Sequence, residues 1–266
     1  SSQDNLAVYD DGHKYCFSCK YYEGQNMETN NPEPKPANFL SGELKSIPNR
    51  KITEKTSRVF GYQQLTSDGK NVEIASFYRD GKVIAQKLRG PNKTFQWRGD
   101  TTNVPLWGQH LWKSSRGKRL VITEGEIDCM TVSQLMEHKW AVVSLPSGAA
   151  GAARAIKDNL EFVSSYEEVV LMFDMDDPGQ DAVNNVADLL PPGKCKVAQL
   201  PYKDPNECIL KGAGKDVVKA IFEAQKFSPD EIVHVSQVTC STALDDVRVY
   251  PFPFDSLSEF LLGQRS

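Results

Sequence analysis

The sequence predicts an α/β protein, in which a parallel sheet with helices on both faces follows a small basic α+β subdomain. From Arg119 onward, apolar runs of strand length alternate with stretches of helical pattern. Such alternation is typical of parallel sheets whose strands are buried on both faces. Residues 38–118 instead carry short strand signals separated by Gly-containing turns, together with an excess of basic residues.

The first 22 residues predict the remnant of a zinc-binding module. They alternate like a hairpin around Cys16 and Cys19, which have C-x-x-C spacing. A structural zinc takes four ligands, so this pair is half a site, and His13 is a nearby candidate for a third ligand. The other four cysteines lack framework spacing, which favours a reducing compartment. Residues 23–37 are polar and Pro-rich and predict a linker.

The basic subdomain is expected over residues 38–118. Its strand signals are "GYQQLT", "VEIASFYR" and "KVIAQKLRG", and its turn signals are "SDGK", "DGK" and "GPNK". Aromatic residues interleave with the basic ones at Phe95, Trp97, Trp107 and Trp112. They can stack on single-stranded bases, but a small subdomain also needs a core, and we favour the core slightly.

The parallel sheet is expected over residues 119–227. Apolar runs followed by helical stretches are "RLVITEGE", "WAVVSLPSG", "EVVLMFDMDD" and "KCKVAQLP". We expect residues 228–266 to be an irregular linker toward a further domain of a longer chain. No apolar run approaches the ~20 residues of a membrane span, and no signal-peptide pattern is present.

The charge distribution favours a nucleic-acid partner. The net charge is −4, yet residues 43–119 hold 16 Lys and Arg against 6 Asp and Glu. A basic segment is often only a solvated surface, but this one precedes a module rich in carboxylates. Nucleic acid held beside a cation site therefore becomes the better interpretation.

Acidic side chains stand at the ends of three predicted strands: Glu124, the pair Asp174 and Asp176, and Asp204. Ligands of open parallel sheets bind at these carboxyl ends. An alternative for any one acid is that it caps the following helix, which we expect of Asp177. The whole set favours Mg²⁺, because residues i and i+2 share one side of a strand and Mg²⁺ prefers oxygen ligands.

A small-residue helix start follows the second predicted strand. In "PSGAAGAA", which contains Ser147 and Gly148, free backbone N–H groups can hold a phosphate. The alternative, which we favour, is that these small residues only allow close packing of helix on sheet.

These motifs resemble a known family. An apolar strand ending E-G-x-x-D and a later strand ending D-x-D resemble the Toprim domain of primases, topoisomerases and some nucleases. With "DGHKYCFSCKYYEG", "QKLRGPNKTF", "LWGQHLW" and "KDPNECIL", the sequence is similar to the primase half of phage-type, Twinkle-like primase–helicases. The resemblance covers residues 1 to about 226.

The resemblance implies roles for individual residues. Glu124 would be the catalytic acid, as general base or metal ligand. Asp174 and Asp176 would bind metal, with Asp204 beside them. Lys87 and Lys93 would contact nucleotide and template. Arg50 matches the family's R-G-I segment, although Lys51 stands where that segment has Gly. His13 would serve template recognition, and the zinc ligands missing beside Cys16 and Cys19 would lie upstream of residue 1.

The resemblance also implies an activity and partners. The expected activity is synthesis of short RNA primers on single-stranded DNA from ribonucleoside triphosphates, with one or two Mg²⁺ ions and with Zn²⁺ in the full-length protein. The expected partners are a helicase domain of the same chain and a replicative DNA polymerase, in the cytoplasm of an infected bacterial host. A Toprim nuclease or topoisomerase subunit, and a non-catalytic DNA-binding scaffold, are the alternatives.

Overall fold

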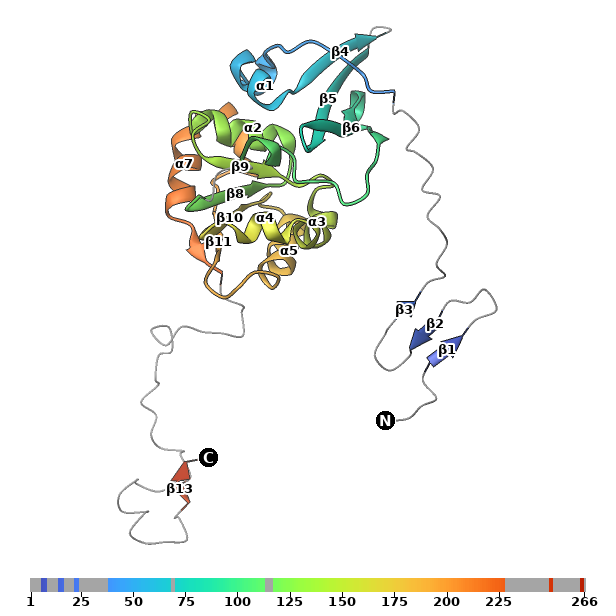
Figure 1. Ribbon diagram of the computed structural model, residues 1–266. Helices are drawn as coiled ribbons and strands as arrows, with labels where there is room; N and C mark the ends of the chain where they lie inside the picture. Colours follow the sequence, from blue (N-terminus) through green and yellow to red (C-terminus); the bar gives the residue numbers. More distant parts are fainter. Residues whose placement is uncertain are drawn as a thin grey trace. The chain divides into compact units, whose positions relative to one another are not determined.

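The computed structural model describes residues 38–67, 70–112 and 117–227, together with five short strands near the chain ends (Figure 1). Three of these, β1 (Leu6–Val8), β2 (Lys14–Cys16) and β3 (Tyr22–Glu23), form an antiparallel sheet. The other two, β13 (Val249–Tyr250) and β14 (Gln264–Arg265), pair with each other within a separate unit, Phe227–Ser266. His13 and Cys19 lie outside the described residues, as does the side chain of Cys16.

The basic subdomain is a four-stranded antiparallel sheet with one helix. The strands follow one another in space as in the chain: β4 (Gln63–Ser67), β5 (Lys70–Arg79), β6 (Lys82–Arg89) and β7 (Phe95–Gly99). The first three match the predicted strand signals, whereas β7 lies in a stretch for which no strand was expected.

Helix α1 (Glu54–Phe60) also lacks a sequence-based prediction. It begins at Thr53, whose hydroxyl accepts a hydrogen bond from the Thr56 amide. It ends at Gly61, which has a φ of +67° and so suits the left-handed turn that closes a helix.

The predicted parallel sheet is present. Its order is β12-β11-β10-β8-β9, and the four parallel strands are β8 (Arg119–Thr123), β9 (Ala141–Ser144), β10 (Glu168–Met172) and β11 (Cys195–Val197). The short antiparallel strand β12 (Gln225–Lys226) covers β11. Strand β12, and not β11, is therefore the edge strand on this side of the sheet.

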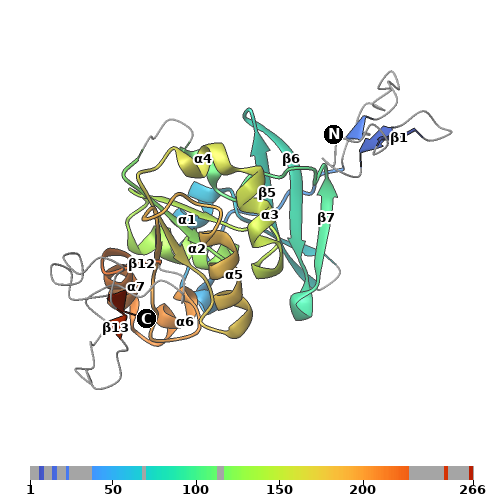
Figure 2. The same ribbon diagram turned by 90° about the horizontal axis from the view of Figure 1, so that it is seen from below.

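Helices cover both faces of this sheet, as predicted (Figures 1 and 2). One face carries α2 (Glu126–Leu135), α6 (Pro205–Leu210) and α7 (Gly214–Phe222). The other carries α3 (Ala152–Asp158), α4 (Leu160–Ser164) and α5 (Asp177–Ala187). None of the described helices has the length and apolar composition that a membrane span requires.

The two subdomains share one hydrophobic core. Trp107, which precedes the sheet, is fully buried and stacks on Phe60 at 4.9 Å between ring centroids. Its backbone pairs with Ser144 in β9, so the segment before the sheet lies along the β9 edge. This common core fixes the basic subdomain relative to the carboxyl ends of the parallel strands.

Candidate functional site

A cleft of about 450 Å³ lies where the basic subdomain meets the carboxyl ends of the strands. Its lining comes from both subdomains: Arg50, Lys87, Arg89, Lys93, Phe95, Trp97, Glu124, Gly125, Glu126, Ile127, Asp128, Pro146, Ser147, Gly148, Asp174, Asp204 and Asn206. Most of the predicted site residues therefore meet in one place. Asp176 is not part of this lining.

Glu124 lies at the carboxyl end of β8, in the floor of the cleft. Its Oε1 accepts a hydrogen bond from the Ala149 amide at 3.2 Å. Its Oε2 is buried and has no hydrogen-bond partner within the described residues. A buried carboxylate oxygen without a partner is costly, so this atom is suited to accept a proton or to bind a cation.

Asp174 follows β10 and is held in a tight turn against α5. A Cβ at Gly179 would lie 2.2 Å from the Asp174 backbone oxygen, so only glycine allows this approach. Burial, together with the charges of Glu124 and Asp204, raises the pKa of Asp174 to about 6, and Lys203 opposes that rise. The carboxylates thus carry negative charge that the neighbouring lysine balances only in part, which favours the binding of a cation.

Asp176 and Asp204 each cap a helix. Asp176 accepts from the Gly179 amide at the start of α5, and Asp204 accepts from the Glu207 amide at the start of α6. Asp177, the expected cap, is instead the first residue of α5. Asp174 and Asp176 lie beyond the last residue of β10, Met172, so the strand-side argument for pairing them does not hold.

Asp128 adds a further carboxylate that the sequence interpretation did not assign. Burial, and then the charges of Asp204 and Asp174, raise its pKa well above the ordinary range for an aspartate. Its Oδ1 accepts the Asn206 amide at 3.1 Å, which ties α2 to the start of α6. Burial and neighbouring negative charge thus both disfavour the ionised form of Asp128, and the charge of Arg50 opposes them.

The donor set fits a hard divalent cation. Every candidate ligand is a carboxylate, and Glu124 Oε2 has no partner within the described residues. Burial, and then the charge of neighbouring carboxylates, raise the pKa values of Asp174 and Asp128. Within the ranges that the structure describes, no three His, Cys, Asp or Glu side chains converge closely enough to hold a metal ion as they stand. A shift of these side chains is therefore required for joint coordination.

Lys203 pairs with two of the carboxylates. Its Nζ lies 2.6 Å from Asp176 Oδ2 and 3.4 Å from Asp174 Oδ2. The hydrogen bond from Lys203 lowers the pKa of Asp176, and the same contacts raise the pKa of Lys203. Lys203 directly precedes Asp204 in "KDPNE", which is the signal that could have drawn attention to it.

The basic wall of the cleft contains two different lysines. Lys87 of β6 forms an ion pair with Glu126 at 2.8 Å, and its ammonium lies 4.9 Å from the centre of the Phe95 ring. Lys93 closes the 3₁₀ turn Pro91–Lys93 with a φ of +59° and makes no ion pair within the described residues. Lys93 is therefore available to an anionic ligand, whereas Lys87 is already paired.

Arg50 and Lys51 connect the basic subdomain to α6. Arg50 donates to Asn206 Oδ1 at 3.2 Å, and Asn206 donates to the Arg50 backbone oxygen at 2.9 Å. Lys51 has a φ of +52°, the left-handed conformation that favours glycine, which explains why the R-G-I segment has Gly there. Its ammonium donates to the Ile209 and Leu210 carbonyls at the end of α6.

Ser147 and Gly148 lie in the cleft at the turn after β9. Gly148 has a φ of +67°, and a Cβ there would lie 3.4 Å from Glu124 Oε1. The next amide, Ala149, donates to Glu124. This helix start therefore already holds a carboxylate, which argues against the phosphate role and agrees with close packing.

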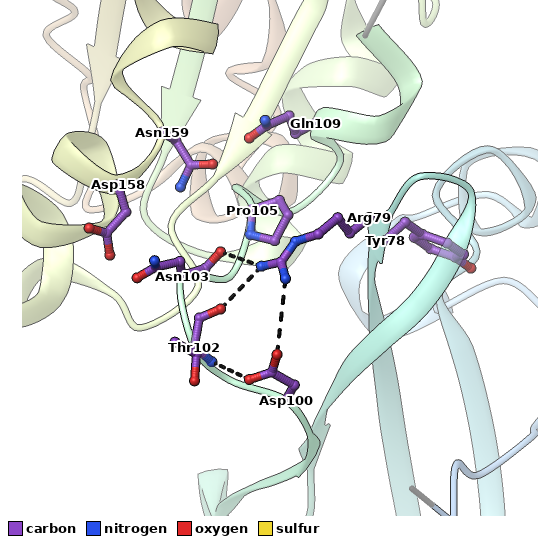
Figure 3. A pocket seen from close by; sticks show the side chains of 9 residues that line it. All are labelled: Tyr78, Arg79, Asp100, Thr102, Asn103, Pro105, Gln109, Asp158 and Asn159. Carbon is purple, nitrogen blue, oxygen red and sulfur yellow. Dashed lines mark hydrogen bonds and ion pairs between the residues drawn. The ribbon is translucent and has the colours of Figure 1, made fainter. Parts of the chain in front are cut away.

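A second cavity of about 450 Å³ shares no lining residue with the cleft, and Figure 3 shows the side chains that line it. Arg79 donates there to the backbone oxygens of Thr102 and Asn103, and it faces Asp100 at 4.0 Å. The Thr102 amide in turn donates to Asp100. Because Arg79 and Asp100 are engaged with each other and with the backbone, and Asp158 pairs with Arg154, we do not place the functional site in this cavity.

The predicted aromatics divide between the core and the cleft. Trp107 is core, and the Trp112 indole donates to the Val142 backbone oxygen. Trp97 packs on Phe77 with 5.1 Å between ring centroids and also lines the cleft. Phe95 is 51% exposed at the same opening. Phe95 and Trp97 are thus the two predicted aromatic residues that line the cleft.

Sequence interpretation missed five residues of this site: Arg89, Glu126, Asp128, Lys203 and Asn206. Glu126 and Asp128 follow Glu124 at two-residue intervals within "EGEID". They belong to the first turn of α2, whose amino end opens onto the cleft, so a helix start predicted at Gly125 would have placed both of them near it.

The fold and the acidic cleft define a Toprim-type domain. The profile of the Toprim-like family matches residues 121–209, and the profile of the N-terminal a+b fold of the bacteriophage T7 DNA helicase/primase matches residues 42–99. The chain belongs to the phage T7-type primase family.

Known proteins support this assignment. The crystallised primase fragment of the bacteriophage T7 primase-helicase is 35% identical, with a TM-score of 0.68, over 83% of this chain and 95% of that chain. Primase domains of T7, solved with an RNA/DNA hybrid, dTTP and the lagging-strand DNA polymerase, are 37% identical, with a TM-score of 0.66, over 70% of this chain and 94% of that chain.

A curated relative is the DNA helicase/primase of Enterobacteria phage T3. It is 37% identical over 249 residues, which cover 87% of this chain and 44% of the relative. The chain thus spans less than half the length of this relative.

Proposed function

We propose that this chain is a DNA primase domain, which synthesises short RNA primers on a single-stranded DNA template. The observation that carries the proposal is the cleft, where carboxylates of the parallel sheet face basic side chains of the other subdomain. A nucleotidyl transfer needs these two kinds of group together, because a hydroxyl must lose a proton next to a triphosphate.

The division of charge suggests where each substrate binds. Lys93, Lys87 and Arg89 are on the wall formed by the basic subdomain. Lys93 makes no ion pair within the described residues and is suited to bind a phosphate of nucleotide or template. Lys87 and Arg89 would bind a phosphate by exchanging their glutamate partners for it. Phe95 and Trp97 stand beside them, where bases can stack. Arg50 lines the same cleft from its position against α6.

The acidic wall would hold the metal ion. Toprim-type primases depend on a metal, and we infer Mg²⁺ because the donor set is made of carboxylate oxygens. Glu124, Asp174 and Asp204 are the candidate ligands in the cleft, with Asp176 next to them. The bound cation would polarise the attacked phosphate and lower the pKa of the attacking hydroxyl.

The protein's own residues then position the reactants. Glu124 Oε2 is the unpartnered carboxylate oxygen that is suited to accept the proton of the attacking hydroxyl or to bind the cation. Lys93 would neutralise charge on the leaving pyrophosphate. The shared core around Trp107 holds the basic and acidic walls of the cleft in a fixed relative position, so that the bound substrates would lie at a constant distance from each other.

The wider setting is also a proposal. Relatives from phages T3 and T7 favour a phage protein that acts in the cytoplasm of an infected bacterium, with a helicase domain and a replicative DNA polymerase as partners. Cys16 and Cys19 would contribute to a zinc site that uses further ligands, and His13 would contact template. We keep 1–22, 23–37, 38–118, 119–227 and 228–266 as the proposed division of the chain.

The test is a primer-synthesis assay with labelled ribonucleotides, single-stranded DNA and Mg²⁺. We expect short oligoribonucleotides that disappear without template, with chelator, or in Asp174→Asn protein. Shortened DNA would instead indicate a nuclease, and bound but unchanged DNA would indicate a scaffold.

A further inference from the structure

Lys203 lies where its ammonium contacts both carboxylates of the D-x-D segment. The ammonium is 2.6 Å from Asp176 Oδ2 and 3.4 Å from Asp174 Oδ2. These are carboxylate oxygens that a cation at this edge of the sheet would also use. An ammonium and a divalent cation cannot share the same oxygens without strong repulsion.

The backbone places this lysine firmly. The Met175 amide donates to the Lys203 backbone oxygen at 2.7 Å, which joins the loop after β10 to the loop before α6. The Lys203 amide donates to Glu207 Oε2 at 3.0 Å, and Asp204 caps α6. The side chain therefore starts from a fixed point between the two acidic loops.

The ammonium itself can leave at low cost. The Lys203 side chain is 53% exposed, and exposed ion pairs contribute little net stability. A long, flexible lysine can turn into solvent while its backbone stays in place. Asp174 is less exposed, at 19%, and keeps its two acidic neighbours when the lysine leaves.

We propose that Lys203 is a built-in counter-cation for Asp174 and Asp176, which holds the acidic loops together without metal and is displaced when a divalent cation binds. Lys203 is thus a positioning residue that raises the metal concentration needed to fill the site. The inference rests on the proposed function, because it takes these acids as metal ligands.

The experiment measures metal binding directly, without primer synthesis. Mn²⁺ binding is followed by electron paramagnetic resonance, and Mg²⁺-dependent stabilisation by thermal unfolding, for the whole chain. Lys203→Met should bind Mn²⁺ with a Kd about two- to fivefold lower than that of the wild type, the size expected for one exposed charge pair. Its melting temperature should be lower without metal and should rise more when Mg²⁺ is added.

Two further variants control for charge and exposure. Lys211→Met removes a lysine of similar exposure, 48%, which pairs with Glu207 at 2.9 Å, and should leave the Kd for Mn²⁺ unchanged. Lys203→Arg keeps the charge and should resemble the wild type. A Lys203→Met protein whose Kd is unchanged or higher would overturn the proposal, as would Mn²⁺ binding by neither protein. Tighter Mn²⁺ binding without primer synthesis in any protein would sink the proposed function and leave this inference standing.

Discussion

The Lys87 ammonium lies 2.8 Å from Glu126 Oε1 and joins β6 of the basic subdomain to the first turn of α2. Both side chains are nearly buried, with exposures of 11% and 13%. The lysine that family resemblance assigns to nucleotide and template is therefore also an ion-pair partner of the acidic wall. Unfolding measurements report the role of Lys87 in stability, and DNA-affinity measurements report its role in binding.

Removing one member of this pair should destabilise the protein. We expect Glu126→Gln or Lys87→Met to cost about 2–3 kcal/mol, because each leaves a nearly buried charge without its partner. The double variant should lose less than the sum of the two, as measured by urea unfolding. The exposed pair Lys45–Glu43, at 3.1 Å, is the matched control and should show coupling below about 0.5 kcal/mol. Additive losses at Lys87 and Glu126 would contradict a functional ion pair.

Asp174→Asn should stabilise the metal-free protein. The folded pKa of about 6 lies above the ordinary value of 3.8, so ionised Asp174 opposes folding at pH values above 6. This cost declines as the pH falls from 6 toward 3.8 and is absent well below 3.8, where Asp174 is protonated in both states. At pH 7.5 with chelator we expect a gain of about 1–2 kcal/mol in urea unfolding.

Asp176→Asn is the comparison for that gain. Asparagine caps helices as well as aspartate, so the Gly179 contact should survive, while the ion pair with Lys203 is lost. We therefore expect unchanged or slightly lower stability, and equal gains in both variants would argue against crowded charge at Asp174.

Single-stranded DNA affinity should depend on the basic wall of the cleft. Lys93→Ala and Lys87→Ala should weaken binding, and each lost phosphate contact should reduce the log–log salt slope by about 0.7. Lys194 and Lys196 are matched controls at the amino end of β11, where Lys194 donates to Ser164 and Lys196 pairs with Glu168. Fluorescence anisotropy across a salt series measures all four. Equal losses in the controls would place the DNA elsewhere.

His138 should make the contact between the two subdomains less stable in mild acid. Its Nδ1 lies 3.0 Å from Ser133 Oγ and its Nε2 lies 3.3 Å from Thr56 Oγ1 of α1. Burial, and then the charge of Lys55, lower its pKa below 6.5. The contribution of neutral His138 to the stability of the protein is thus fully present above pH 6.5. It declines below pH 6.5, because the unfolded chain binds the proton more readily than the folded chain does.

The test of this expectation is thermal unfolding between pH 7.5 and pH 5.5. His138 has a φ of +59°, which asparagine tolerates, so His138→Asn is the suitable variant. The wild type should lose about 1–2 °C more than the variant over this range. If the melting temperatures of the wild type and His138→Asn fell by the same amount over this pH range, His138 would not be the cause of the acid sensitivity.

The sequence was most informative where a pattern is long and has one physical meaning. The buried strands β8, β9 and β10 follow continuous apolar runs, and strand ends of a parallel sheet meet at one edge, so Glu124, Asp174 and Asp204 could be brought together in advance. Short elements such as α1 and β7 are decided by packing against Trp107 and β6, which no local pattern records.

Carboxylates near a helix start are harder to interpret, because one side chain can cap and bind at once. Asp176 caps α5 and pairs with Lys203, and nothing in the spacing of "DMDD" distinguishes it from Asp177. The orientation of Asp128 depends on where α2 begins, and its raised pKa arises from Asp204 and Asp174 on other loops. These contacts join side chains from different loops, so they form only when the chain folds and cannot be deduced from local spacing.

The pairing of Trp107 with Ser144 has a practical consequence for anyone who shortens this chain. Strand β9 ends the sheet, and the segment around Trp107 lies along that open edge. A truncated product starting at Arg119 would expose the β9 edge and the apolar surface left by the indole. Unprotected edges of this kind pair with strands of other molecules, so such a fragment should aggregate during expression. The Toprim-like match begins at residue 121, so the bounds of the family match are not the bounds of a stable fragment.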